Sequence, residues 1–172
     1  MDRERFVKNS DGVETDKELR DLFAGMGLNS IDGVFEFAGG ENLTKANLAS
    51  YRGRVRFSAG ERIFYLKKFD GAPLLEQVKN WLCRRRRISF AGLEYAAGKE
   101  LAEAGIKTPK AVAFGERWGM VFEKRSFIIT EQLYGAEALE RKLPGCFWRR
   151  QRFAEGAAGF HQEGCGVCAA IS

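Results

Sequence analysis

The stretch Arg62-Ile63-Phe64-Tyr65-Leu66-Lys67-Lys68-Phe69 places two lysines inside a run that is otherwise apolar and prone to form a β-strand. Neighbouring side chains of a strand point to opposite faces, so only one of Lys67 and Lys68 can face a given pocket. An inward-facing ammonium needs a partner, because burying it unpaired is costly. Glu94, in a later helix-like segment, is the candidate partner of Lys67. The alternative is that both lysines and the glutamate are solvated at the surface.

Strand-like segments lie on both sides of this run. Residues 52–58 alternate apolar and basic side chains, and the short connection Ala59-Gly60-Glu61 has the length of a hairpin turn. The pattern predicts three successive antiparallel strands and then two or three more. The predicted strands are residues 43–50, 52–58 and 63–69, followed by 109–114, 118–122 and 126–133.

Helical patterns occupy other parts of the chain. Residues 16–25 predict a short helix after a polar leader, and residues 34–37 predict a brief extended element before a glycine turn. Pro73 opens a second helix, with apolar side chains on one face. Residues 90–104 form the longest predicted helix, with Glu94 at the edge of its apolar stripe. One long helix between the third and fourth of five strands is typical of the amino-terminal lobe of a protein kinase.

A series of short motifs, in this order and spacing, resembles the bacterial lipopolysaccharide core kinase family, the Kdo/WaaP and InaA-like group. The resemblance covers roughly residues 43–164. Its motifs are Phe64-Tyr65-Leu66-Lys67, Gly71, Glu76, Lys79-Asn80, Glu94, Gly105-Ile106, Thr108, Val112-Ala113-Phe114-Gly115-Glu116 and Ser126-Phe127-Ile128-Ile129-Thr130-Glu131.

The resemblance implies an α+β, protein-kinase-like fold. Residues 1–30 would be a leader with a short helix, and residues 31–133 a kinase-like amino-terminal lobe with an antiparallel five-stranded sheet and one packed helix. Residues 134–172 would hold the hinge and the first helices of an incomplete carboxy-terminal lobe. The family uses ATP with magnesium, and its acceptor is a hydroxyl of heptose or Kdo in the inner core of lipopolysaccharide, or another anionic glycolipid at a membrane surface.

Carried over by position, Lys67 matches the lysine that contacts phosphate, and Glu94 its helix partner. Glu131 and Leu133 match the hinge, whose backbone would meet adenine. Gly53 falls at the end of the phosphate-covering loop, where it is the one glycine left of the usual three. A plain strand turn is an equally good interpretation of Gly53.

The match ends after Phe160-His161 and Gly164. The family continues with a catalytic aspartate and a later metal-binding aspartate, whereas this chain has no aspartate after Asp70. No catalytic or metal-binding residue is therefore assigned. We expect the chain to be inactive in phosphoryl transfer by itself, because the nucleophile would lack its base and the phosphates their metal. A non-catalytic kinase-like module that binds nucleotide or a partner protein is the alternative.

The terminal Cys165-Gly166-Val167-Cys168 could bind zinc with His161 and Cys146, or could belong to a non-native ending produced by truncation or a frameshift. His161 is otherwise expected to pack at a helix end. An apolar surface is expected near the hinge, where Phe147, Trp148, Phe153 and Phe160 would lack cover.

The net charge of +5, from 28 basic and 23 acidic residues, indicates a mixed surface with local basic patches. A secretion signal and a spanning apolar run are not evident, so we expect a cytoplasmic protein with peripheral contact at the inner membrane. Arg84-Arg85-Arg86-Arg87 could contact anionic headgroups, as could Lys79, Trp81 and Trp148-Arg149-Arg150, or these residues could simply be solvated. Nucleic acid is not an expected partner, because the spacing of known nucleic-acid motifs is lacking.

Overall fold

The computed structural model describes residues 5–44 and 49–135. It divides the chain into two compact units, residues 1–134 and residues 135–172. The expectations for the terminal cysteine pair, for Cys146 and His161, and for the apolar residues between 147 and 160 lie outside the described residues. No helix among the described residues is both long and apolar enough to cross a bilayer.

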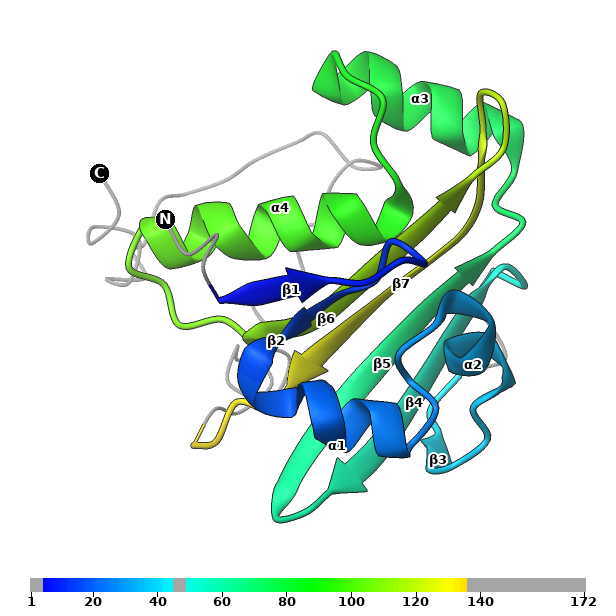
Figure 1. Cartoon of the computed structure of the whole chain (residues 1–172). Coiled ribbons are helices and arrows are strands. Elements are labelled where there is room, and N and C mark those ends of the chain that lie inside the picture. The colour runs from blue at the N-terminus through cyan, green and yellow to red at the C-terminus, as the bar shows by residue number, and fades with distance from the viewer. Residues whose placement is uncertain (1–4, 45–48, 136–172) are drawn as a thin grey trace, which may run out of the picture. The chain divides into compact units, whose positions relative to one another are not determined.

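The described part of the chain is built around one antiparallel sheet of seven strands (Figure 1). The spatial order is β1-β2-β6-β7-β5-β4-β3, so the three longest pairings, β6 with β7, β7 with β5 and β5 with β4, form its centre. The strands are β1 (Phe6–Lys8), β2 (Glu14–Asp16), β3 (Glu41–Asn42), β4 (Arg52–Ala59), β5 (Arg62–Asp70), β6 (Ala111–Trp118) and β7 (Glu123–Glu131).

The predicted hairpin of β4 and β5 is confirmed. The two strands pair from Arg52 opposite Phe69 to Ala59 opposite Arg62, and Gly60 turns the chain with a φ of 61°. Left-handed backbone of this kind suits glycine, which has no Cβ to clash. The opening stretch is thus strand β5, an interior strand of the sheet, with β4 on one side and β7 on the other.

Three strand predictions were wrong in detail. The strand expected at 43–50 is not present at residues 43, 44, 49 and 50, residues 45–48 of it lie outside the described part, and the short strand β3 lies just before it at Glu41–Asn42. The extended element expected at 34–37 is helix α2 (Ile31–Glu36), because Ser30 caps it by accepting a hydrogen bond from the N–H of Gly33. The strand expected at 118–122 is a turn, closed by the N–H of Gly119 donating to the carbonyl of Phe122.

The amino-terminal residues add two strands that the sequence pattern did not predict. Val7 lies opposite Thr15 in the β1 and β2 pair, and Thr15 lies opposite Ala113 of β6. The five strands expected therefore become seven. The short helix expected at 16–25 is present as a 3₁₀ turn, η1 (Lys17–Leu19), followed by α1 (Arg20–Gly25).

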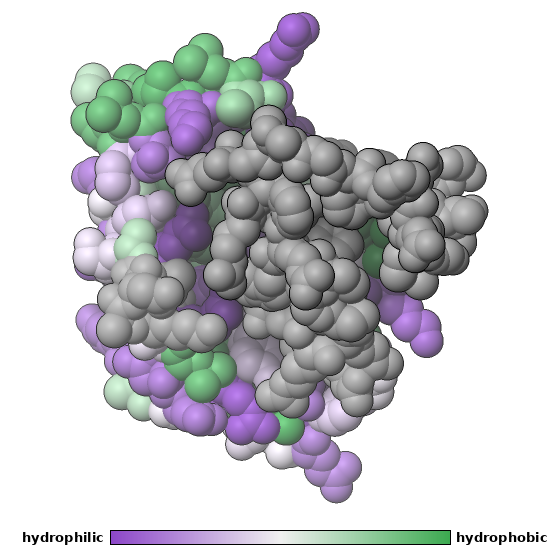
Figure 2. Space-filling model, turned by 180° about the vertical axis from the view of Figure 1, so that it is seen from behind, coloured by the Kyte–Doolittle hydropathy of each residue, from purple (hydrophilic) through white to green (hydrophobic). Residues whose placement is uncertain are grey.

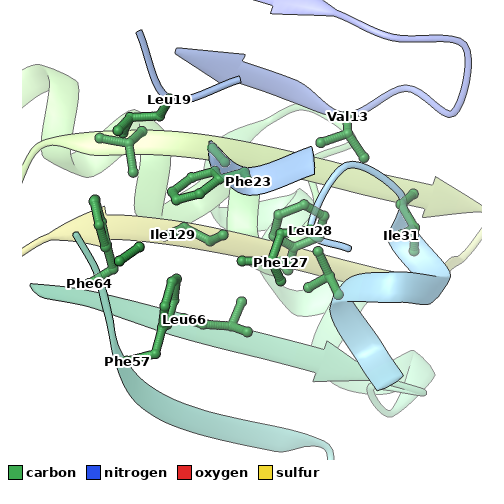
Figure 3. Close-up of a cluster of buried hydrophobic side chains, with 14 residues drawn as sticks. Val13, Leu19, Phe23, Leu28, Ile31, Phe57, Phe64, Leu66, Phe127 and Ile129 are labelled. Carbon is green, nitrogen blue, oxygen red and sulfur yellow. The ribbon is translucent and has the colours of Figure 1, made fainter. Parts of the chain in front are cut away.

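Each face of the sheet carries its own apolar cluster. The larger cluster joins the sheet to α1 and α2 through Phe23, Phe64, Phe127 and other side chains, as Figure 3 shows. The smaller cluster lies on the opposite face, where Phe69 and Ile128 pack against Phe90 and Ala91 of helix α4 (Phe90–Glu103). Alternation along β5 and β7 produces both clusters, because odd and even residues of a strand face opposite sides.

Candidate functional site

Lys67 projects from the middle of β5 on the face covered by α4, and its Nζ donates a hydrogen bond to Oε2 of Glu94. Glu94 lies in the second turn of α4. The side chains remain 29% and 36% exposed, respectively. At this exposure an ion pair contributes only about 0–1 kcal/mol to folding. Lys67 and Glu94 therefore meet in an open position, where the ammonium can also reach an outside group.

The two residues line a cleft on this face of the sheet. Its floor includes Tyr65, Ile128 and Thr130. Six of its lining side chains are basic and three are acidic, so the cleft has an excess of positive charge. The basic residues are Arg5, Lys8, Arg54, Lys67, Lys99 and Lys110, and the acidic residues are Glu14, Glu94 and Glu103.

Arg54 is the unpredicted cleft residue that lies nearest to Lys67 in the sheet register. It lies directly opposite Lys67 in the β4 and β5 ladder, so the two cations share one face with no carboxylate between them in the register. Two positive charges opposite each other repel, so a bound anion between them would be favourable. The signal was available in the alternation of Arg52, Arg54 and Arg56, together with the hairpin turn that fixes the register.

The amino terminus of α4 is fixed to β7 by side chains. The N–H of Phe90 donates to Oε2 of Glu123 at 2.9 Å, and the N–H of Ala91 donates to Oγ of Ser126 at 3.2 Å. Ser89, the N-cap, accepts from the N–H of Gly92 at 2.9 Å. The first three free amides of the helix are thus satisfied. Because two of the three acceptors belong to β7, the helix that carries Glu94 is positioned by the sheet that carries Lys67.

Glu123 is an unusual residue for this role, because its carboxylate is almost completely buried, at 4% residue exposure. Burial raises the pKa of Glu123, and this effect outweighs the neighbouring Ser126 and the amide of Phe90, which lower the pKa. Oε1 of Glu123 has no hydrogen-bond partner among the described residues. The backbone of Glu123 is held separately by Gln77, whose side chain accepts from its N–H at 2.8 Å and donates to its carbonyl at 3.1 Å.

Lys68 lies on the opposite face from Lys67, as the alternation predicted. Its Nζ donates to the carbonyls of Phe35 and Phe37 at 3.2 and 3.1 Å, at the carboxyl end of α2. A cation is favourable at this end of a helix. Burial lowers the pKa of Lys68. The structure thus gives Lys68 a role in packing and leaves Lys67 to the cleft.

The other residues carried over from the resemblance do not line the cleft with Lys67. Gly53 lies opposite Lys68, and a Cβ built on it would lie 3.6 Å from the Cβ of Lys68, so it belongs to the other face. Glu131, at the end of β7, forms an ion pair with Arg62 at 3.7 Å. Leu133 follows β7 and is half-buried. The backbone N–H of Glu131 is also used already, because it donates to the carbonyl of Lys110 at 2.8 Å.

One known protein family matches the part of the chain that holds this cleft. The sequence model of the lipopolysaccharide kinase (Kdo/WaaP) family matches residues 47–152, more than half of the chain. The chain belongs to this family. The matched segment contains Lys67, Glu94, Arg54 and Glu123, and it leaves out β1, β2 and both short helices before β3.

Individual relatives agree with the family assignment. The lipopolysaccharide core heptose(I) kinase WaaP of Escherichia coli K12 is 35% identical over 89 residues, which are 52% of this chain and 34% of that protein. WaaP of Pseudomonas aeruginosa is 35% identical over 89 residues, which are 52% of this chain and 33% of that protein. The matched segment thus spans about a third of the length of these relatives.

A solved structure extends the agreement to the fold. WaaP in complex with acyl carrier protein superposes with a TM-score of 0.51 and 22% identity, and the match covers 84% of this chain and 48% of that chain. At this identity the likeness concerns the fold alone. It confirms the predicted α+β, kinase-like lobe, to which the structure adds the two amino-terminal strands.

Proposed function

We propose that the described residues form the nucleotide-binding lobe of a lipopolysaccharide core kinase, with ATP as phosphoryl donor and a sugar hydroxyl of the inner core, on heptose or Kdo, as acceptor. The observation that carries this proposal is the pairing of Lys67 with Glu94 in a basic cleft. In kinases a strand lysine held by a helix glutamate contacts the phosphates of ATP.

The chemistry of the cleft supports phosphates as ligands. Glu94 holds the Lys67 ammonium on the cleft side of β5. Arg54 lies opposite on β4, and its guanidinium can bind two phosphate oxygens at once. Leu133 would contribute backbone groups, because the N–H groups of Glu131 and Gln132 already donate to the carbonyls of Lys110 and Ile63. These roles orient and neutralise the donor, and the transfer step itself requires groups that we do not assign to any described residue.

Magnesium accompanies ATP in this family and would neutralise part of the phosphate charge. The described residues include no group of three or more His, Cys, Asp or Glu side chains that could hold a metal ion. Residues 5–44 and 49–135 therefore do not fit a protein-built magnesium site. Lys67 and Arg54 act on the phosphates directly, and their role does not depend on the metal.

Calorimetric titration of the 172-residue chain with ATP tests the proposal. Lys67→Ala removes a charge-assisted contact of about 1.5–3 kcal/mol, so we expect affinity to fall by roughly 10- to 150-fold. Glu94→Gln should weaken binding less, because Lys67 keeps its charge and loses only its positioning partner. Lys107→Ala, an exposed lysine outside the cleft lining, is the matched control and should bind like the unchanged chain.

Failure would take either of two forms. An unchanged chain that does not bind ATP at millimolar concentration contradicts nucleotide binding by this lobe. Equal affinity of Lys67→Ala and Lys107→Ala contradicts the role of Lys67. Phosphate incorporation into core oligosaccharide by the 172-residue chain would contradict both the expected inactivity of this chain and the non-catalytic alternative.

A further inference from the structure

Helix α3 (Leu74–Arg84) exposes the apolar face that a surface helix normally buries. Leu74, Leu75 and Leu82 are 55%, 84% and 73% exposed, and Val78 is also exposed. In a helix these positions fall on one arc of the surface. Met120 and Val121, in the turn between β6 and β7, are exposed as well, and they line the same shallow pocket as Leu74. Figure 2 shows apolar surface gathered at the upper left, over α3.

A neighbouring face of α3 is anchored to the start of β7 and to the loops beside it, so the helix cannot turn its apolar face inward. Gln77 is buried and forms hydrogen bonds with the backbone of Ala72 and Glu123. Trp81 stacks on Phe122 with ring centroids 5.4 Å apart, and its Nε1 donates to the carbonyl of Ile88 at 3.0 Å. The exposed leucines are thus a fixed feature of the folded lobe.

Cations border this apolar surface. Arg85 ends α3 in a left-handed conformation, with a φ of 51°, and begins the run that continues to Arg87. Arg84 is paired with Glu100 at 3.7 Å, and Arg87 stacks over Trp118 at 4.1 Å. Lys79, Arg85, Arg86 and Lys124 are absent from the ion pairs of the described residues, and the side chain of Lys124 lies against Gly119, next to Met120. Glu76 is the one acidic residue of α3.

We propose that α3, with the β6–β7 turn, is a docking surface for an anionic phospholipid bilayer. An apolar helix face bordered by free cations is the arrangement that binds at the headgroup region of a membrane. The exposed apolar side chains of α3 and of the turn enter the boundary of the acyl chains, and the lysines and arginines contact lipid phosphates. These apolar residues are Leu74, Leu75, Val78, Leu82, Met120 and Val121. A second copy of the chain fits less well, because a two-fold contact would bring the same cations together. This inference goes beyond nucleotide binding and does not depend on it.

Co-sedimentation with vesicles tests the docking surface on the 172-residue chain. Vesicles of phosphatidylglycerol and phosphatidylcholine should retain the protein, and vesicles of phosphatidylcholine alone should retain at least tenfold less. Leu75→Ser with Leu82→Ser should lower binding to the anionic vesicles at least tenfold. Both positions are exposed, so folding should be preserved. Leu101→Ser with Ile106→Ser, two exposed apolar positions on and just after α4, is the matched control and should bind normally.

A second set of variants tests how much the cations contribute to vesicle binding. Lys79→Gln, Arg86→Gln and Lys124→Gln together should weaken binding to anionic vesicles by roughly fivefold for each charge removed. The same number of changes at Lys17, Lys99 and Lys107 should have little effect. Binding that is equal for the α3 and control variants would overturn the proposal. So would a stable dimer, seen by analytical ultracentrifugation, that the Leu75 and Leu82 changes dissociate, because a second copy would then cover the surface.

Discussion

Replacing Glu123 by alanine should destabilise the lobe more than replacing any exposed glutamate or aspartate by alanine. The change removes the acceptor of the Phe90 N–H, which is 2.9 Å from Oε2 and buried. Loss of this buried hydrogen bond and the orphaned amide together cost about 2–4 kcal/mol. At roughly 3 °C per kcal/mol for a chain of this size, the melting temperature should fall by about 6–12 °C.

Urea unfolding followed by tryptophan fluorescence measures this difference. Glu76→Ala is the matched control, because Glu76 is a glutamate in the first turn of helix α3 (Leu74–Arg84) that is exposed, and it should cost less than about 1 kcal/mol. If Glu123→Ala costs no more than Glu76→Ala, β7 does not position α4 through this carboxylate, and the reasoning is wrong.

The pH dependence of Glu123 provides an independent check. Burial raises its pKa in the folded state, so its contribution to stability is fully present below the unfolded pKa and is lost as pH rises through the folded pKa. Glu123→Gln keeps an acceptor for Phe90 but cannot ionise. We therefore expect Glu123→Gln to gain stability relative to the unchanged chain as pH rises from 4.5, the ordinary value for a glutamate, through the raised pKa of folded Glu123. A difference that stays constant over this range would contradict the burial effect.

Three further changes test other parts of the structure. Lys68→Met should cost about 1–2 kcal/mol in urea unfolding, because the carbonyls of Phe35 and Phe37 lose their donor, whereas Lys67→Met should cost less than about 1 kcal/mol. Gly115→Ala should cost about 1–3 kcal/mol, since its Cβ would lie 2.5 Å from the ring of Phe127; a melting temperature that does not fall would contradict this packing. Arg117 lowers the pKa of Asp32 through a hydrogen bond, so the stability difference between Asp32→Asn and the unchanged chain should be present at pH 6 and disappear as pH falls through the folded pKa of Asp32, below 3.8.

The centre of the lobe could be predicted because its strands are long. Nine residues of β5 show the alternation clearly, and this alternation separates Lys67 from Lys68 without any structure. The ends of the sheet could not be predicted in the same way. Strands of three residues, such as Phe6–Lys8, are too short to show a period of two, and only pairing across the chain defines them.

The wrong strand prediction at residues 34–37, which form the end of α2, has a local cause. Val34, Phe35 and Phe37 have high β-propensity, but Ser30 caps a helix and the carboxyl end of that helix binds Lys68. In this segment tertiary contacts outweigh intrinsic preference. The buried Glu123 was not predicted either, because a glutamate at the start of a strand resembles an ordinary surface residue until the end of α4 is placed beside it.

The edges of the sheet limit how far its strands can pair with another molecule. Without β2, the eight residues of β6 would offer free amide and carbonyl groups to another molecule. Residues 6–16 cover that edge, and the sheet then ends in three-residue β1 on one side and two-residue β3 on the other. Neither is long enough to template intermolecular pairing. A shortened chain that begins at residue 31 would lose this cover and should aggregate through β6.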